Sequence, residues 1–127
     1  MEVKFPVFVR EKDSGEVTQY ASVSEMQRQF EEIDVENNEY EAWDAQGIRL
    51  VLIVQPPIWL RIEPSNTATR QNELADAIRT YAETEEVQVD FSGLNRNEFT
   101  AVLDRVRNAI RSKARSKTWW RRFKARF

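Results

Sequence analysis

The sequence predicts a single small α+β domain, and three observations point to it. The chain has 127 residues, which is enough for one compact domain and short for two. Hydrophobic residues make up 41% of it, so a buried core is expected rather than a disordered chain. Segments of apolar/polar alternation are interspersed with apolar stripes of helical period. The predicted order is approximately ββαβββαβα, a mainly antiparallel sheet with helices on one face and a basic aromatic helix at the C-terminus.

The N-terminal part predicts a β-hairpin followed by a short helix. Alternating residues predict strands over Val3–Glu11 and Val17–Val23, and the sequence Asp13-Ser14-Gly15 between them is typical of a turn. Either Ser22 with Glu25 or Ser24 with Gln27 provides a capping box for the helix that follows. Its apolar stripe, at positions i, i+4 and i+7, consists of Met26, Phe30 and Ile33.

A second hairpin and a further strand complete the predicted sheet of the first half. The pattern predicts strands over Glu39–Trp43 and Ile48–Val54, joined by a turn at residues 44–47. Ile58–Ile62 adds a strand after the Pro56-Pro57 break. The preceding segment, residues 31–41, is rich in carboxylates. Its spacing does not match an EF-hand loop, so a solvated surface explains it better than a metal site.

The second half predicts two amphipathic helices with a brief strand between them. One helix has an apolar face at Leu74, Ala75, Ile78, Tyr81 and Ala82. Val87–Phe91 then alternates as a strand would, and Ser92-Gly93 turns the chain. The apolar face of the last helix consists of Phe99, Val102, Leu103, Val106 and Ile110.

The charges are distributed very unevenly along the chain. Ten of the 19 basic residues lie in residues 105–127, and all 21 acidic residues precede that segment. The first 104 residues therefore carry a formal charge of −12 and the last 23 carry +10, although the whole chain has a net charge of only −2. Such an asymmetry favours a segment that contacts an anionic surface, or one that folds against its own acidic body.

We therefore divide the chain into an acidic α+β domain, residues 1–111, and a cationic-aromatic C-terminal tail, residues 112–127. The tail is expected to be helical, either free or packed on the domain. At about 100° per residue its four aromatic residues gather within roughly 100° of arc, rotated by roughly 100° from the apolar face of the preceding helix. The residues expected to contact a partner surface are Arg111, Lys113, Arg115, Lys117, Trp119, Trp120, Arg121, Arg122, Phe123, Lys124, Arg126 and Phe127.

An aromatic face beside a cationic one is typical of a helix that lies in a membrane interface. The sequence thus predicts a binding protein that contacts an anionic membrane surface or an acidic protein partner through its tail. One alternative is a nucleic-acid-associated protein, in which cations hold phosphates while rings stack on bases. The acidic body opposes this alternative by repelling a polyanion. A second alternative is a structural or homo-oligomeric domain whose tail is internal to the fold.

The composition argues against catalysis. His and Cys are both absent, which removes the commonest general base near neutral pH, the thiolate nucleophile and the commonest zinc ligands. Carboxylate pairs alone can perform hydrolysis, but none stands in a recognisable catalytic motif. We expect no enzymatic activity, no cofactor and no metal. Without a signal-peptide pattern or an apolar run of about 18 residues, we expect a cytoplasmic protein, peripheral to the membrane where the tail contacts it.

Overall fold

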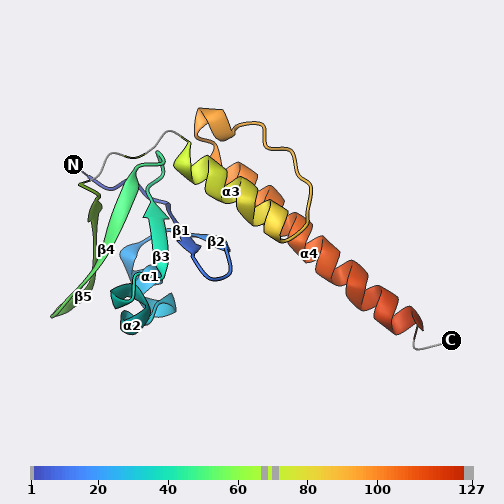
Figure 1. The fold of residues 1–127 in the computed structure, drawn as a ribbon, viewed down its shortest axis with the longest axis horizontal. Coiled ribbons are helices and arrows are strands. Elements are labelled where there is room, and N and C mark those ends of the chain that lie inside the picture. The colour runs from blue at the N-terminus through green and yellow to red at the C-terminus, as the bar shows by residue number, and fades with distance from the viewer. Residues whose placement is uncertain (1, 67–68, 70–71, 125–127) are drawn as a thin grey trace.

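A single antiparallel sheet occupies one side of the molecule, and the longest helices occupy the other (Figure 1). The computed structural model describes residues 2–66, 69 and 72–124, and the side chains of residues 58 and 117–124 lie outside this description. Within these residues the sheet has five strands in the order β2-β1-β3-β4-β5. The predicted α+β class is therefore confirmed. The strands are β1 (Val7–Glu11), β2 (Val17–Tyr20), β3 (Tyr40–Trp43), β4 (Arg49–Gln55) and β5 (Ile58–Pro64).

Both predicted hairpins are present, and local turn chemistry explains them. In the first, Val7 pairs with Tyr20, and the turn contains Gly15 at a φ of +76°, a backbone conformation that glycine adopts without strain. In the second, Trp43 pairs with Arg49 around a turn that begins at Asp44. The Asp44 carboxylate accepts hydrogen bonds from the backbone N–H groups of Gln46 and Ile48, at 2.9 and 3.0 Å. A short polar side chain thus closes this turn.

The predicted single helix after the first hairpin is two helices, α1 (Val23–Gln29) and α2 (Glu32–Glu36). Ser22 and Glu25 do cap α1, since the Ser22 hydroxyl accepts from Glu25 N and the Glu25 carboxylate accepts from Ala21 N. The chain becomes extended at Phe30, however, and this breaks the helical period. Ile33, expected on the buried stripe, is consequently 59% exposed, and Val35 is buried in its place.

The second half contains α3 (Glu73–Thr84), a short 3₁₀-helix η1 (Leu94–Arg96) and α4 (Phe99–Lys124). The strand predicted at Val87–Phe91 is wrong, because this segment does not join the sheet. Its apolar side chains pack against the core under α3 and α4. The guanidinium of Arg105 donates to the carbonyl oxygens of Asp90 and Ser92, so a side chain satisfies backbone groups there that a neighbouring strand would otherwise bond.

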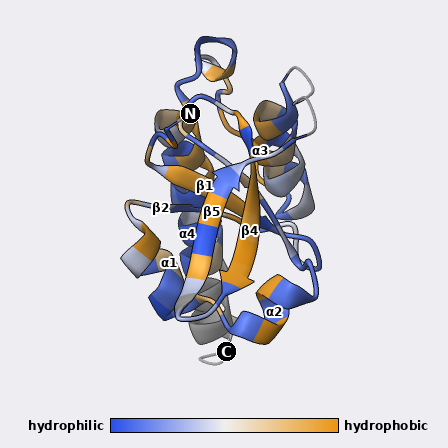
Figure 2. Ribbon diagram, turned by 90° about the vertical axis from the view of Figure 1, so that its left-hand side faces the viewer, coloured by the Kyte–Doolittle hydropathy of each residue, from blue (hydrophilic) through white to orange (hydrophobic). Residues whose placement is uncertain are grey.

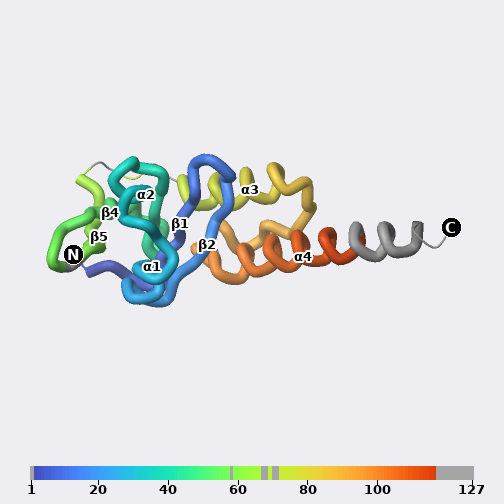
Figure 3. The backbone as a smooth tube through the Cα atoms, turned by 90° about the horizontal axis from the view of Figure 1, so that it is seen from below, coloured from blue at the N-terminus to red at the C-terminus, as the bar shows by residue number. Residues whose placement is uncertain are grey.

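The helices cover both faces of the sheet, whereas the sequence predicted one covered face. Successive residues of a strand point to opposite faces, and β1 uses both. Val7 and Val9 pack in a core with residues of α1 and α2, whereas Phe8 packs in a second core with α3 and α4. In Figure 2, α1 and α2 flank β5 and β4. Figure 3 shows α3 and α4 together at the other end of the molecule.

The Asp44 turn gives a test of this fold. Asp44 is only 2% exposed, so replacing it with Ala removes a buried acceptor from the partly buried hydrogen bonds of the Gln46 and Ile48 N–H groups. We expect Asp44→Ala to lower the free energy of unfolding by about 1.5–3 kcal/mol. Asp44→Asn keeps an acceptor oxygen and should cost clearly less. Urea unfolding followed by circular dichroism measures both, and equal losses for the two variants would contradict this role of the carboxylate.

Candidate functional site

Helix α4 connects the core to the predicted tail. It is 26 residues long and begins with a stripe of buried side chains at helical spacing. The stripe packs against α3 and against Phe8 of β1, whose ring meets that of Phe99 edge to face at 5.8 Å. Its buried members are Phe99, Val102, Leu103 and Val106, and the partly buried Ile110 continues it. Tertiary packing therefore fixes the direction in which the helix leaves the body.

Beyond Lys113, α4 separates from the body. Figure 1 shows it running past the end of α3 and away from the sheet. The side chains of residues 111–116 are exposed except that of Lys113. One continuous helix thus spans the boundary placed between residues 111 and 112, so the orientation of the tail backbone is set by the buried first half of the same helix.

Lys113 is held by the end of α3. Its Nζ donates to the carbonyl oxygens of Glu85 and Glu86, at 2.9 and 3.3 Å, and lies 3.6 Å from the Glu86 carboxylate. The last carbonyls of a helix carry partial negative charge, so a lysine there is stabilising. This contact explains why the apolar stripe of α4 stops at Lys113. Lys113 therefore joins α4 to the end of α3 and is not a free cation.

The remaining predicted contact residues fall into three groups. Arg111 and Arg115 are exposed, and no hydrogen bond or ion pair joins them to another described residue. A second group belongs to α4 by its backbone, but its side chains lie outside the described ones: Lys117, Trp119, Trp120, Arg121, Arg122, Phe123 and Lys124. Arg126 and Phe127 lie outside the described residues altogether.

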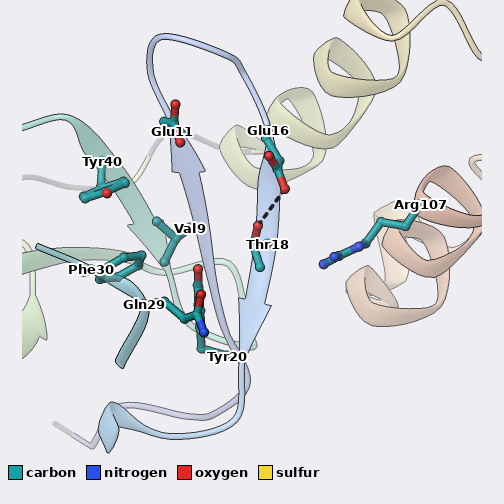
Figure 4. A pocket seen from close by; sticks show the side chains of 9 residues that line it. All are labelled: Val9, Glu11, Glu16, Thr18, Tyr20, Gln29, Phe30, Tyr40 and Arg107. Carbon is teal, nitrogen blue, oxygen red and sulfur yellow. Dashed lines mark hydrogen bonds between the residues drawn. The ribbon is translucent and has the colours of Figure 1, made fainter. Parts of the chain in front are cut away.

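A cleft that the sequence did not predict opens between the sheet and α4 (Figure 4). It has a volume of about 340 Å³, and strands, the end of α1 and α4 all contribute to its wall. Figure 4 shows Arg107 reaching from α4 toward the β2 side of the cleft, with Glu11 and Glu16 near the turn between β1 and β2. The lining residues are Val9, Glu11, Glu16, Thr18, Tyr20, Gln29, Phe30, Tyr40 and Arg107.

Aromatic rings form one wall of this cleft, and carboxylates lie near its two tyrosines. Phe30 stacks on Tyr40 with ring centroids 4.5 Å apart, and Tyr20 meets Phe30 edge to face at 5.1 Å. Burial, together with the carboxylates of Asp34, Glu11 and Glu39, raises the pKa of Tyr40 to about 12. Burial also raises the pKa of Tyr20, opposed in part by the hydrogen bond with Thr18 and, to a smaller extent, by Arg107. The cleft is therefore negative at its tyrosine wall, and Arg107 supplies the opposite charge.

On the opposite face of the sheet, charged side chains form a chain of ion pairs. Glu41 accepts from Arg10 at 2.8 Å and from Arg49 at 3.0 Å, and Arg49 also bonds the Glu73 carboxylate. Glu73 in turn accepts from the indole N–H of Trp43. These contacts tie α3 to the centre of the sheet. Each of these charged groups has a partner within the set, which indicates a structural role rather than a binding site.

The carboxylate-rich segment forms α2 and the start of β3, which is a central strand. Across the described residues, no cluster of acidic side chains could hold a metal ion. The same part of the chain has no helix that is both long and apolar enough to cross a membrane. Comparisons with protein-family models, with curated proteins and with solved structures gave no match in any of the three. We therefore infer the function from the chain's own chemistry.

The raised pKa of Tyr40 predicts how stability depends on pH. An unfolded tyrosine ionises near pH 10, whereas folded Tyr40 holds its proton to about pH 12. The stability that Tyr40 contributes is fully present below about pH 10 and is lost as pH rises toward 12, because the unfolded chain gives up the proton first. Urea midpoints at increasing pH should fall less steeply for Tyr40→Phe than for the natural chain. Parallel curves for the two proteins would contradict the shift.

Proposed function

We propose that this protein binds reversibly to an anionic membrane surface through the exposed half of α4 and the rest of the tail. One observation supports this most directly: α4 packs in the core as far as Ile110, bonds the end of α3 at Lys113 and then continues through Lys124, with no acidic residue beyond Asp104. At 1.5 Å per residue the continuation from Ile110 to Lys124 is about 21 Å long. A rigid cationic helix held away from an acidic body is suited to lie along a surface.

The charges favour one orientation of the molecule on the membrane. Each basic residue near an anionic leaflet contributes about 1 kcal/mol, so several together with inserted aromatic rings give roughly micromolar binding. The acidic body is repelled by the same surface. By helical period the aromatic positions of the tail are rotated by roughly 100° from the stripe that packs on α3. The body would then lie beside the inserted face and leave it accessible.

An acidic protein or a nucleic acid would bind the tail differently from a membrane. An acidic protein would use the same cations but would not need Trp119 and Trp120 to insert into a lipid phase. Binding to a nucleic acid should fall steeply and continuously with ionic strength, since each neutralised phosphate releases counterions. Insertion of aromatic rings instead leaves a remainder that salt does not remove.

The two adjacent tryptophans provide the first test. We expect the Trp119→Ala/Trp120→Ala variant to lose at least about tenfold in affinity for phosphatidylserine-containing vesicles, because burial of one large apolar side chain contributes roughly 1.5–3 kcal/mol. Co-sedimentation with vesicles measures the affinity. Phe5→Ala, which removes an exposed aromatic ring from the body, is the matched control and should bind as the natural chain does.

Urea unfolding of the same variants separates binding from folding. If the rings are free, the double variant keeps the stability of the natural chain. A loss of several kcal/mol would place the rings in the core and overturn the proposal. Unchanged vesicle binding by the double variant, with binding abolished at high salt, would instead show that the basic residues hold the anionic lipid by charge alone, and it would contradict insertion of the rings.

A further inference from the structure

Arg107 differs from the other half-buried arginines. Three of the arginine side chains that the structure describes are half-buried: Arg10, Arg49 and Arg107. The first two bond the Glu41 carboxylate at 2.8 and 3.0 Å. Arg107 forms no hydrogen bond or ion pair with any described residue. A half-buried guanidinium that no hydrogen bond occupies keeps its donors for an anion from outside the chain.

Arg107 also lies where two clefts meet. It lines the tyrosine-walled cleft of Figure 4 and a second cleft of about 450 Å³. The second cleft is lined by Gln19, Asp104, Arg107, Asn108 and Arg111. Because Arg111 follows Arg107 by four residues on α4, the two guanidinium groups occupy the same side of the helix on successive turns. Both are therefore placed to donate to one ligand.

Polar donors accompany this pair. The side-chain oxygen of Gln19 accepts from the Thr100 hydroxyl at 3.0 Å, which leaves the Gln19 NH₂ group available as a donor. Asn108 adds a second amide to the same lining. Among the described residues of this lining, Asp104 is the one carboxylate, and no ion pair joins it to Arg107 or Arg111. Two guanidinium groups and two amides suit the several oxygens of a phosphoryl group better than a single carboxylate.

The first cleft carries the complementary charge. Glu11 and Glu16 line it from the strand ends next to the β1–β2 turn, whereas Arg107 comes from α4 (Figure 4). Among the described residues of this cleft, the Glu16 carboxylate accepts one long hydrogen bond of 3.5 Å, from the Thr18 hydroxyl. A ligand with only negative charge would be repelled at this end. A ligand with an ammonium group would be attracted by the carboxylates and by the electron-rich faces of the tyrosine wall.

We propose that Arg107 and Arg111 bind the phosphoryl group of a small phosphorylated amine, whose ammonium group lies toward Glu11 and Glu16. The ligand occupies the junction of the two clefts, between β2 and α4. Such a group is available from two sources, a soluble phosphoester or the head group of a lipid. The site does not involve Trp119, Trp120 or Phe123, so it does not depend on the proposed insertion of the tail into a membrane.

Calorimetric titration of the full chain with three probes tests the site. Phosphoethanolamine carries both charges, inorganic phosphate carries only the anion, and ethanolamine carries only the cation. We expect phosphoethanolamine to bind at least about tenfold more tightly than either of the other two, since each end adds a charge-assisted contact. Equal binding of phosphoethanolamine and inorganic phosphate, or no binding of either, would overturn the proposal.

Variants of the intact chain assign the two ends. Arg107→Gln should weaken both phosphoethanolamine and phosphate by about ten- to a hundredfold, whereas Glu16→Gln should weaken only phosphoethanolamine. Asp104→Asn removes a repelling carboxylate and should strengthen both. Arg28→Gln, on the exposed surface of α1, removes the same charge outside the clefts and is the matched control. If Arg28→Gln weakens binding as much as Arg107→Gln, the effect is one of net charge and the site is refuted.

Two further measurements separate this site from the tail and identify the source of the ligand. The Trp119→Ala/Trp120→Ala variant should bind phosphoethanolamine normally even where it fails to bind vesicles, and a parallel loss would refute a separate site. Vesicles of phosphatidylethanolamine that compete with soluble phosphoethanolamine would support the site with a lipid head group as its ligand. Tight binding of phosphoethanolamine without such competition would support the site with a soluble phosphoester.

Discussion

The buried stripe of α4 is the interaction on which the rest of the structure depends. Phe99, Val102, Leu103 and Val106 pack against α3 and the face of the sheet that carries Phe8. Removing a fully buried Val or Leu side chain typically costs about 1–5 kcal/mol, so this stripe holds a large share of the stability of a small domain. The same packing fixes the rotation of the helix about its axis. That rotation decides which side chains face β2, which face α3 and which leave the body.

Two consequences follow from this rotation, and they differ in kind. Lys113 falls over the C-terminal end of α3, where its ammonium group bonds two backbone carbonyls and closes the contact between the helices. Arg107 and Arg111 fall instead toward the edge of the sheet, where the described residues offer them no partner. The basic residues of α4 are therefore not one uniform set. Some stabilise the fold, and others remain available for an external anion.

Local chemistry made much of the fold predictable from the sequence. The two hairpins, α3 and α4 follow from alternation, turn residues and apolar stripes that the structure retains. The predictions that failed depend on contacts distant in sequence. Val87–Phe91 alternates as a strand does, but the core under α3 and α4 covers its apolar side and Arg105 donates to the Asp90 carbonyl oxygen. Coverage of both faces depends likewise on distant contacts, because Phe8 of β1 packs against Phe99 of α4 on the face opposite to Val7 and Val9.

The candidate site shows the same limit. The charge asymmetry and the aromatic tail were visible in the sequence, whereas the cleft beside Arg107 requires β2 and α4 to meet across more than 80 residues of chain, as the bond between Gln19 and Thr100 shows. The spacing of Arg107 and Arg111 was the only local signal. Because both arginines precede the exposed end of the same rigid helix, a ligand bound between β2 and α4 and a surface bound by the tail would be fixed relative to each other. A phosphoryl group held at Arg107 would also neutralise charge next to the acidic body, so it would change the field that orients the body on a membrane without moving the helix.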